Sequence, residues 1–480
     1  MDTSMSLSAW FAVGLSLLLP WLTGTVLMRR LWSVGTPGAW PLALGYGYWL
    51  ALPAGALALY PLSMLGLRVA FWLLMFGFAL TLGWAVRGWR PSGWGAFQSF
   101  RPAWNSDTRA LGSGLLFALL LGWIGLRFTV LALEVWWQPL YPWDAWTTWA
   151  VRARVWSELG QLVPFVAPEV WASDSAGAVY TIEAWHYPPL VSLLALWPTL
   201  AAGGWNETAA NLPWLGAAIA LALGFYGQAR LWGASPLTSL VALWLLISLP
   251  LLDSHVALAG YADLWLAGAL GLSLMAFLHW MRAGDRRQAV LCLVLAATWP
   301  LLKLEGAVWL LLLVPAWIFA EARWRRIGLS LIAAAVLGFG CAWLIGLRFE
   351  APLIGLVEVG SGTVQLPVIG GFELGYLDSW GVFAQALLGL ENWHLLGYLL
   401  AVGLVVAIWR VVRGERVSWL LSGLTLALCS LVLLWGLFFL TDAHRWAEQG
   451  TSLGRLLLHF MPFYVFFLLT LWVRDQNVSA

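Results

Sequence analysis

Long apolar runs separated by short polar connections dominate the chain from end to end. Most of them match the roughly 17 to 25 residues that an α-helix needs to cross a bilayer. Gly and Pro interrupt them too often for the regular alternation of a β-barrel. The pattern predicts an all-α polytopic integral membrane protein with about thirteen transmembrane helices. The expected spans are Leu7–Met28, Trp40–Leu62, Gly66–Val86, Leu111–Leu133, Asn211–Leu231, Leu237–Leu252, Asp263–Met281, Ala289–Leu302, Leu304–Ala320, Ile327–Leu347, His394–Val412, Val417–Leu440 and Leu456–Val473.

One further apolar segment, Pro188–Leu200, is short and begins with proline, so whether it crosses the membrane is left open. The expected topology follows from the positions of the arginines, which favour cytoplasmic connections. The arginines fall in every second connection between spans, provided that Pro188–Leu200 does not cross the membrane. This places the loops 134–189 and 348–393 on the exterior side and the tail 474–480 in the cytoplasm.

Composition narrows the class of protein further. Hydrophobic residues make up 61% of the 480 residues and charged residues only 10%, which excludes a soluble globular protein. The net charge of +2 argues against nucleic acid as a partner. The three cysteines all lie in apolar runs, so neither a disulfide nor a thiolate metal site is expected.

The first exterior loop collects charges, prolines and aromatics together. Trp146, Trp149, Ala153 and Trp156 recur at helical spacing, while Thr148 and Arg152 fall on another face. Ala145–Glu158 is therefore expected to be an amphipathic helix in the membrane interface. Asp144 precedes its first turn, where the helix N-terminus favours a carboxylate. A simpler interpretation is that Asp144 only caps the helix and the tryptophans only anchor it.

A second candidate region contains two charged residues where the short apolar runs Ala289–Leu302 and Leu304–Ala320 meet. They meet at Lys303, the only lysine of the chain, and at Glu305. Ionisable groups at membrane depth are costly and normally serve a cavity. The alternative is an ion pair that only ties the two helices together.

Polar residues that the expected topology gathers at the exterior side are the candidates for a site. A carboxylate among Arg, Lys and His suits the deprotonation of a hydroxyl while cations hold a phosphate leaving group. Arg455 and His459 are four residues apart, so they share one face at the start of the last span. The candidates are Asp144, Arg152, Arg154, His186, Asp263, Lys303, Glu305, Arg348, Glu350, Arg455 and His459.

Several short motifs occur in the order seen in GT-C glycosyltransferases. Residues 111–473 resemble the bacterial branch with the protein O-mannosyltransferases and the lipid A aminoarabinose transferase, and residues 1–110 would be additional transmembrane helices and a cytoplasmic loop. The motifs are Trp143-Asp-Ala-Trp-Thr-Thr-Trp-Ala-Val-Arg-Ala-Arg154, Trp185-His-Tyr-Pro-Pro-Leu190, Gly204-Trp-Asn-Glu-Thr-Ala-Ala-Asn-Leu-Pro213, Gly260-Tyr-Ala-Asp263, Leu302-Lys-Leu-Glu-Gly306 and the segment Arg455 to Pro462.

The resemblance implies a GT-C fold and a polyprenyl-phosphate-linked sugar as donor. Asp144 resembles the first-loop acid, which acts as general base or orients the acceptor, and Asp263 resembles the second exterior acid. Two departures stand out. This chain has Ala210-Asn-Leu-Pro213 where relatives commonly have Ala-Arg-Leu-Pro, and it has one acid beside Trp143 where metal-dependent oligosaccharyltransferases have a pair.

The expected roles of the other residues follow from the same resemblance. Arg152, Arg154, Lys303 and Arg455 would bind the donor phosphate, and Trp143, His186, Glu305 and His459 would bind substrate, without a metal or cofactor. The prediction is an inverting glycosyltransferase of the bacterial inner membrane, embedded in membrane lipids, with its site facing the periplasm and a lipid, glycan or protein as acceptor. The rivals are a transporter or flippase of lipid-linked sugars and a non-catalytic subunit of an envelope polysaccharide assembly.

Overall fold

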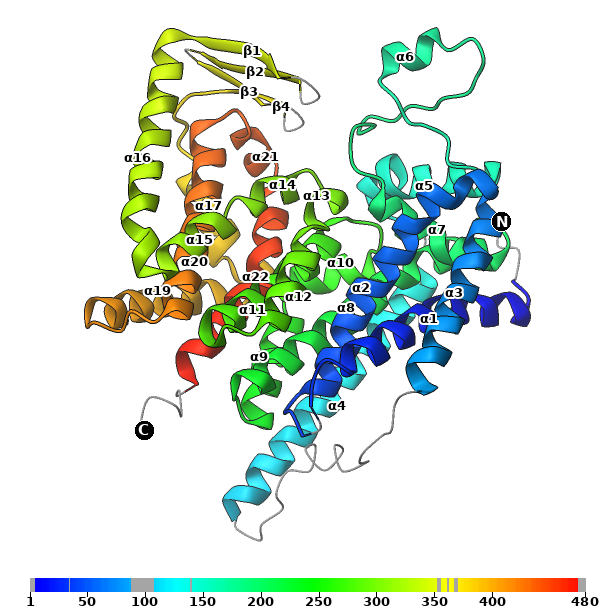
Figure 1. Ribbon diagram of the computed structural model, residues 1–480, viewed down its shortest axis with the longest axis horizontal. Coiled ribbons are helices and arrows are strands. Elements are labelled where there is room, and N and C mark those ends of the chain that lie inside the picture. Colours follow the sequence, from blue (N-terminus) through cyan, green and yellow to red (C-terminus); the bar gives the residue numbers. More distant parts are fainter. Residues whose placement is uncertain are drawn as a thin grey trace. The chain divides into compact units, whose positions relative to one another are not determined.

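The structure of the protein is a computed structural model that describes residues 5–33, 35–87, 108–138, 140–351, 355–360, 362–366 and 370–473. The described residues are mostly helical (Figure 1). Two compact units divide the chain, the first from Met1 to Leu272 and the second from Ser273 to Trp472. The boundary lies inside the helix α11 (Asp263–Ala283). The functional boundary expected near residue 110 stays a prediction.

Nine helices of the described part are long and apolar enough to cross a membrane, or up to eleven if each of two bent pairs forms one span. The chain is thus a multi-pass membrane protein, and the exact count of thirteen stays a prediction. The nine candidates are Leu7–Arg29, Ala39–Leu65, Leu67–Arg87, Gly112–Trp137, Glu207–Trp232, Asp263–Ala283, Arg326–Ile345, Ser418–Leu440 and Leu453–Trp472.

Close backbone approach holds the first unit together. A Cβ on Gly45 would lie 2.3 Å from the backbone N of Gly224, and one on Gly24 would lie 2.2 Å from the carbonyl O of Gly47. Glycine therefore lets α2 pack tightly against both α1 and α8. The helices of this unit before α11 are α1 (Leu7–Arg29), α2 (Ala39–Leu62), η1 (Ser63–Leu65), α3 (Leu67–Arg87), α4 (Thr108–Trp137), η3 (Ala145–Trp149), α5 (Ala150–Leu159), α6 (Pro168–Ser173), α7 (Leu190–Ala202), α8 (Glu207–Trp232), α9 (Pro236–Ile247) and α10 (Pro250–Ala257).

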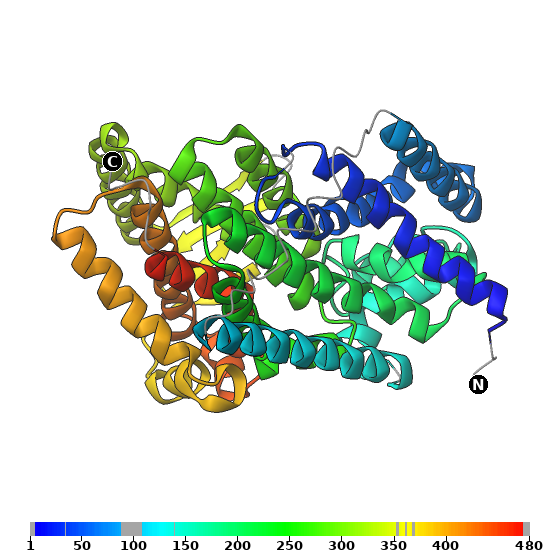
Figure 2. The same cartoon turned by 90° about the horizontal axis from the view of Figure 1, so that it is seen from below.

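The helices of the first unit differ in how much of their surface the protein covers. A core of aromatic rings lies where α2, α8 and α11 meet, and Trp265 contacts Tyr48, Trp49 and Trp214 there. In contrast, α4 is one long helix (Figures 1 and 2) and only 11% of its apolar window is buried. Such a surface suits contact with lipid chains.

The uncertain segment Pro188–Leu200 forms α7, a helix of 13 residues whose side chains are almost all buried. At 1.5 Å per residue α7 is about 20 Å long, which is too short for a hydrocarbon layer of about 30 Å. Its apolar character therefore reflects burial inside the protein.

The second unit contains shorter helices than the sequence predicts. In place of the expected spans Ala289–Leu302 and Leu304–Ala320 it has four short helices, because Pro300 begins a new turn and the backbone is extended at Lys303. The helices of this unit after α11 are α12 (Arg286–Ala296), α13 (Trp299–Leu302), α14 (Glu305–Leu310), α15 (Leu313–Ala320), α16 (Ala322–Ile345), α17 (Trp380–Leu388), α18 (Leu390–Trp393), α19 (Leu396–Val412), α20 (Ser418–Leu440), α21 (His444–Glu448) and α22 (Leu453–Trp472).

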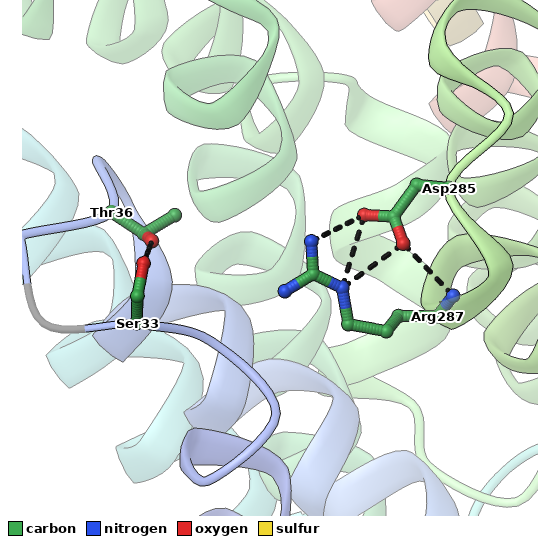
Figure 3. A network of polar contacts seen from close by, with 4 residues as sticks. All are labelled: Ser33, Thr36, Asp285 and Arg287. Carbon is green, nitrogen blue, oxygen red and sulfur yellow. Dashed lines mark hydrogen bonds and ion pairs between the residues drawn. The ribbon is translucent and has the colours of Figure 1, made fainter.

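Side chains at two helix connections stabilise their turns. The carboxylate of Asp285 accepts the backbone N–H of Arg287 at 2.9 Å and also pairs with its guanidinium at 2.9 Å, which caps the start of α12 (Figure 3). In the connection between α1 and α2, the hydroxyls of Ser33 and Thr36 lie 2.9 Å apart (Figure 3). Both are local contacts within a single turn.

An antiparallel sheet occupies part of the region expected to be the exterior loop 348–393, and it adds strands to the all-α expectation. Its order is β1-β2-β3-β4, and β1 follows α16 directly (Figure 1). Backbone hydrogen bonds join the chain after β4 to the end of α20, for example from Gly375 N to Leu440 O at 3.1 Å. The strands are β1 (Leu347–Ala351), β2 (Gly355–Gly360), β3 (Thr363–Leu366) and β4 (Gly370–Glu373).

Candidate functional site

The candidate site residues fall into two groups according to the compact units. Those of the first unit are Trp143, Asp144, Arg152, Arg154, His186 and Asp263, and those of the second are Lys303, Glu305, Arg348, Glu350, Arg455 and His459.

The helix predicted after Asp144 is present, but its first turn is wider than an α-helix. Ala145–Trp149 is a π-helix that continues into α5. Trp149, Ala153 and Trp156 are buried as one face, whereas Trp146 is exposed and its ring lies edge-on to Trp143 at 4.7 Å. Trp146 does not lie on the buried face with the other three residues, because the extra residue in a π-turn shifts the phase of the side chains before it.

Asp144 lies immediately before this π-turn and is half-buried. Its side chain makes no capping hydrogen bond to the helix that follows. The simpler interpretation, in which Asp144 serves only as a helix cap, therefore lacks the contact that defines a cap.

The motif Gly260-Tyr-Ala-Asp263 packs directly against the start of the same π-turn. A Cβ on Gly260 would lie 2.4 Å from the Cβ of Ala145, and the φ of +118° at Gly260 also favours glycine. The indole of Trp214 holds this segment by donating to the carbonyl O of Tyr261 at 2.7 Å. The contact joins two motifs that are far apart in the sequence.

Asp263 is fully buried in the first turn of α11. Both predicted acids therefore lie at the N-terminal ends of helices, where N–H groups and the helix dipole favour negative charge. Asp144 is the direct neighbour of Ala145 in the sequence, and Asp263 is three positions after Gly260. Asp144 and Asp263 belong to separate elements of the chain. The contact between Gly260 and Ala145 brings the two segments together.

Arg152 is buried, and its guanidinium donates hydrogen bonds to the loop that contains Trp185 and Tyr187. It donates to the carbonyl O atoms of Tyr187 at 2.9 Å and Trp185 at 3.1 Å, and it lies over the ring of Phe165. Burial lowers the pKa of Arg152 to about 10. These contacts give Arg152 a visible role in holding the loop, and the phosphate contact expected for it stays a prediction.

Arg154 and His186 lie nearer to solvent. Arg154 forms an ion pair with Glu158 at 2.7 Å, and this hydrogen bond raises the pKa of Arg154. His186 is exposed beside the ring of Trp185, and partial burial followed by the charge of Arg152 lowers the pKa of His186. Neutral His186 is thus the favoured form near pH 7.

One ion pair of the first unit, between two apolar helices, was not predicted from the sequence. Arg127 of α4 pairs with Asp253 of α10, and both line a small cavity with otherwise apolar walls. The helices α9 and α10 meet at an angle of 67°, and Asp253 lies just after this bend. Arg127 interrupts the apolar run Leu111–Leu133, so the sequence does show a charge inside a predicted span. It does not show the partner, because the position of Asp253 depends on the bend between α9 and α10.

In the second unit, Lys303 and Glu305 form the ion pair considered from the sequence. The Nζ of Lys303 lies 2.9 Å from Oε1 of Glu305, and the lysine side chain is 8% exposed. Arg348 and Glu350 both lie on β1, and Arg348 faces Glu358 of β2 at 3.7 Å. The ion pair of Lys303 and Glu305 is therefore present. Whether it only ties the helices together or also serves a phosphate site stays a prediction.

His459 lies in α22, one turn after Arg455, and is fully buried. The indole Nε1 of Trp309, from α14, donates to His459 Nδ1 at 3.2 Å. Trp309 was not a candidate from the sequence, since one tryptophan among thirty-eight carries no signal. Within the described ranges, no group of three His, Cys, Asp or Glu side chains is arranged to hold a metal ion.

No protein-family model, no curated protein and no solved structure matches the chain. The resemblance to GT-C glycosyltransferases therefore depends on the sequence motifs alone.

Proposed function

We propose that the chain is an inverting membrane glycosyltransferase, with the GT-C fold, that moves a sugar from a polyprenyl-phosphate donor to an acceptor on the exterior face of a bacterial inner membrane. The observation that carries the proposal is the contact between Gly260 and Ala145. It brings the segments of Asp144 and Asp263 together at two helix N-termini, in a protein with many membrane spans.

The proposed reaction is a direct displacement at the anomeric carbon. Asp144 takes the proton of the acceptor hydroxyl, and the acceptor oxygen forms a bond to the anomeric carbon. The bond between that carbon and the phosphate oxygen breaks, and the polyprenyl phosphate leaves with the electron pair. Cations would stabilise the charge of the leaving phosphate, and the candidates that the resemblance implies are Arg154, Lys303 and Arg455.

Arg152 has a different part in this proposal from the one that the resemblance implies. Its two terminal nitrogens donate to loop carbonyls, so Arg152 would hold the loop that carries His186. Through this loop it would shape the acceptor side. Trp143 is exposed and its ring is available for stacking on a sugar.

The decisive test is the Asp144→Asn variant of the purified protein, assayed with a radiolabelled polyprenyl-phosphate sugar in proteoliposomes. Loss of the general base is expected to lower the rate of transfer by about 10²- to 10⁴-fold. The matched control is Glu183→Gln, which makes the same change on an exposed carboxylate of the same loop and should keep the rate within about twofold.

Two results would count against the proposal. Unchanged transfer in Asp144→Asn would remove Asp144 as the base. Movement of the labelled lipid across the bilayer, with the sugar still attached to its phosphate, would instead favour a flippase.

A further inference from the structure

The antiparallel sheet of the second unit has one apolar face and one polar face. Side chains alternate between the two faces of a strand, so the register assigns each residue to a face. The apolar face carries Leu347, Phe349, Val357, Val359, Val364 and Phe372. The opposite face carries Arg348, Glu350, Glu358, Thr363, Gln365 and Glu373, together with one leucine, Leu356. The sheet is therefore amphipathic.

The described part of the chain covers the apolar face only in part. Val359 of β2 and Val364 of β3 are buried. On the edge strand β1, in contrast, Leu347 is 43% exposed and Phe349 is 47% exposed. The register places these two side chains on the same face as the buried valines. The apolar face is thus open along the edge that β1 forms.

Both edges of the sheet are joined to helices that are candidate membrane spans, α16 and α20. β1 begins two residues after Ile345, the last residue of α16 (Figure 1). At the other edge, Leu374 follows β4 and pairs with Thr441, which ends α20. A sheet that is fixed to the ends of two spans lies at the surface of the membrane.

The exposed surface of α16 continues into the open edge of the sheet. In the last turn of α16, Leu344 is 84% exposed and Ile345 is 82% exposed. At about 3.3 Å per residue, Leu347 lies within about 7 Å of Ile345, and Phe349 lies within about 13 Å. The headgroup layer of a bilayer is itself about 5 to 8 Å thick. If α16 crosses the bilayer, β1 therefore begins inside this layer.

We propose that the apolar face of the sheet rests on the bilayer that α16 crosses, with Leu347 and Phe349 inserted among the phospholipids of that leaflet. Lipid is the occupant because the open surface runs on from a helix that is only 6% buried in its apolar window. Insertion removes apolar surface from water, as it does for an interfacial amphipathic helix. The polar face, with the ion pair of Arg348 and Glu358, then faces water.

This contact with lipid is independent of the proposed sugar transfer. It assigns β1 a place in the interface, beside the span that leads into it. Arg348 and Glu350, which alternate with Leu347 and Phe349, are kept on the water side by the same register.

Photo-crosslinking of the full-length protein in phospholipid nanodiscs identifies what covers the apolar face. In one variant p-benzoylphenylalanine replaces Phe349, and in the matched control it replaces Glu350, the next residue on the opposite face. Mass spectrometry after irradiation is expected to find a phospholipid adduct at position 349 and much less of it at position 350. Equal lipid adducts at both positions, a link to a second protein chain at position 349, or no adduct there would each overturn the proposal.

A spin label gives a second measurement that does not depend on a crosslink. Phe349→Cys and Glu350→Cys are labelled with a nitroxide, and Leu337→Cys on the exposed surface of α16 serves as the lipid control. The native cysteines are first replaced by serine at Cys292, Cys341 and Cys429. Oxygen concentrates in lipid, whereas a nickel chelate stays in water. The label at Phe349→Cys is expected to collide more with oxygen than with the chelate, as at Leu337→Cys, and the label at Glu350→Cys should show the reverse.

Two outcomes of the spin-label measurement would contradict the contact with lipid. Equal access of the nickel chelate to Phe349→Cys and Glu350→Cys would show that the sheet stands in water. Protection of Phe349→Cys from both reagents would show that protein, such as a second copy of the chain, covers this face.

Discussion

The helices α2 and α16 have the same length and pass the same test for a membrane span, but they have opposite environments. In the apolar window of α2, 72% of the residues are buried, compared with 6% for α16. The mean hydropathy is 1.4 for α2 and 2.1 for α16, so the buried helix is the less apolar one. A helix that faces lipid needs apolar side chains all round, whereas a helix inside the protein can carry polar groups that find partners there.

Glycine shows the same difference. In α2, Gly45 lies against the backbone of α8, whereas around Gly340 in α16 a Cβ would meet no described atom within 4 Å. Glycine in α2 therefore permits close packing, and Gly340 has no comparable contact in the second unit. The comparison predicts that one substitution has opposite effects in the two helices.

The largest effect is expected for Gly45→Ala. Its new methyl group would meet backbone atoms of Gly224, which cannot rotate away, so the helices must separate, and the expected loss is about 3 kcal/mol or more of the free energy of unfolding. Unfolding by denaturing detergent, followed by circular dichroism, measures it. Gly340→Ala is the control, and it should be neutral or stabilising by up to about 1 kcal/mol. Equal destabilisation in both would show that the contrast between α2 and α16 is not real.

A smaller loss of the free energy of unfolding is expected when the charge of Arg127, on the largely exposed helix α4, is removed. Arg127→Leu removes the cation that pairs with the carboxylate of Asp253, at a cost of about 2 to 3 kcal/mol. The double variant Arg127→Leu/Asp253→Leu removes both charges and should recover most of the loss. The same unfolding assay compares the three proteins, and a double variant as unstable as the single one would show that the pair does more than neutralise charge.

The smallest effect is expected for the hydroxyl of Tyr46 in α2. It donates to Leu272 O at 2.6 Å and accepts from the amide of Gln228 at 2.6 Å, so Tyr46→Phe should cost about 1 kcal/mol. Among the described residues, Ser330 of α16 donates to its own helix alone, at Arg326 O. Ser330→Ala should therefore change the free energy of unfolding by less than about 0.5 kcal/mol, and a cost equal to that of Tyr46→Phe would remove the distinction.

Much of the candidate site was recognisable from the sequence as separate motifs. The helix after Asp144 and the Lys303–Glu305 pair could be predicted because each depends on residues close together in the chain. The occupation of Arg152 by loop carbonyls could not, because an arginine on a helix looks the same whether it faces a ligand or its own loop. The π-turn that exposes Trp146 also has no sequence signal at this length.

The sheet β1–β4 was missed for a related reason. Between Leu347 and Glu373 the chain alternates in short segments, but its polar residues suggested an exterior loop. Only the register shows that Phe349 faces Val357, and that Arg348 faces Glu358 on the other side. Strand pairing is a contact between segments, and a single short segment does not determine it.

The sequence by itself determined that this is a multi-pass helical membrane protein, because lipid offers no hydrogen bonds and each apolar run must satisfy its own backbone as a helix. It also determined where charged residues interrupt those runs. Only the tertiary structure decided which helices face protein or lipid, that Gly260 packs against Ala145, and that Trp309 donates to His459. These contacts join residues more than a hundred positions apart, and they depend on how whole helices pack, which no local pattern of residues specifies.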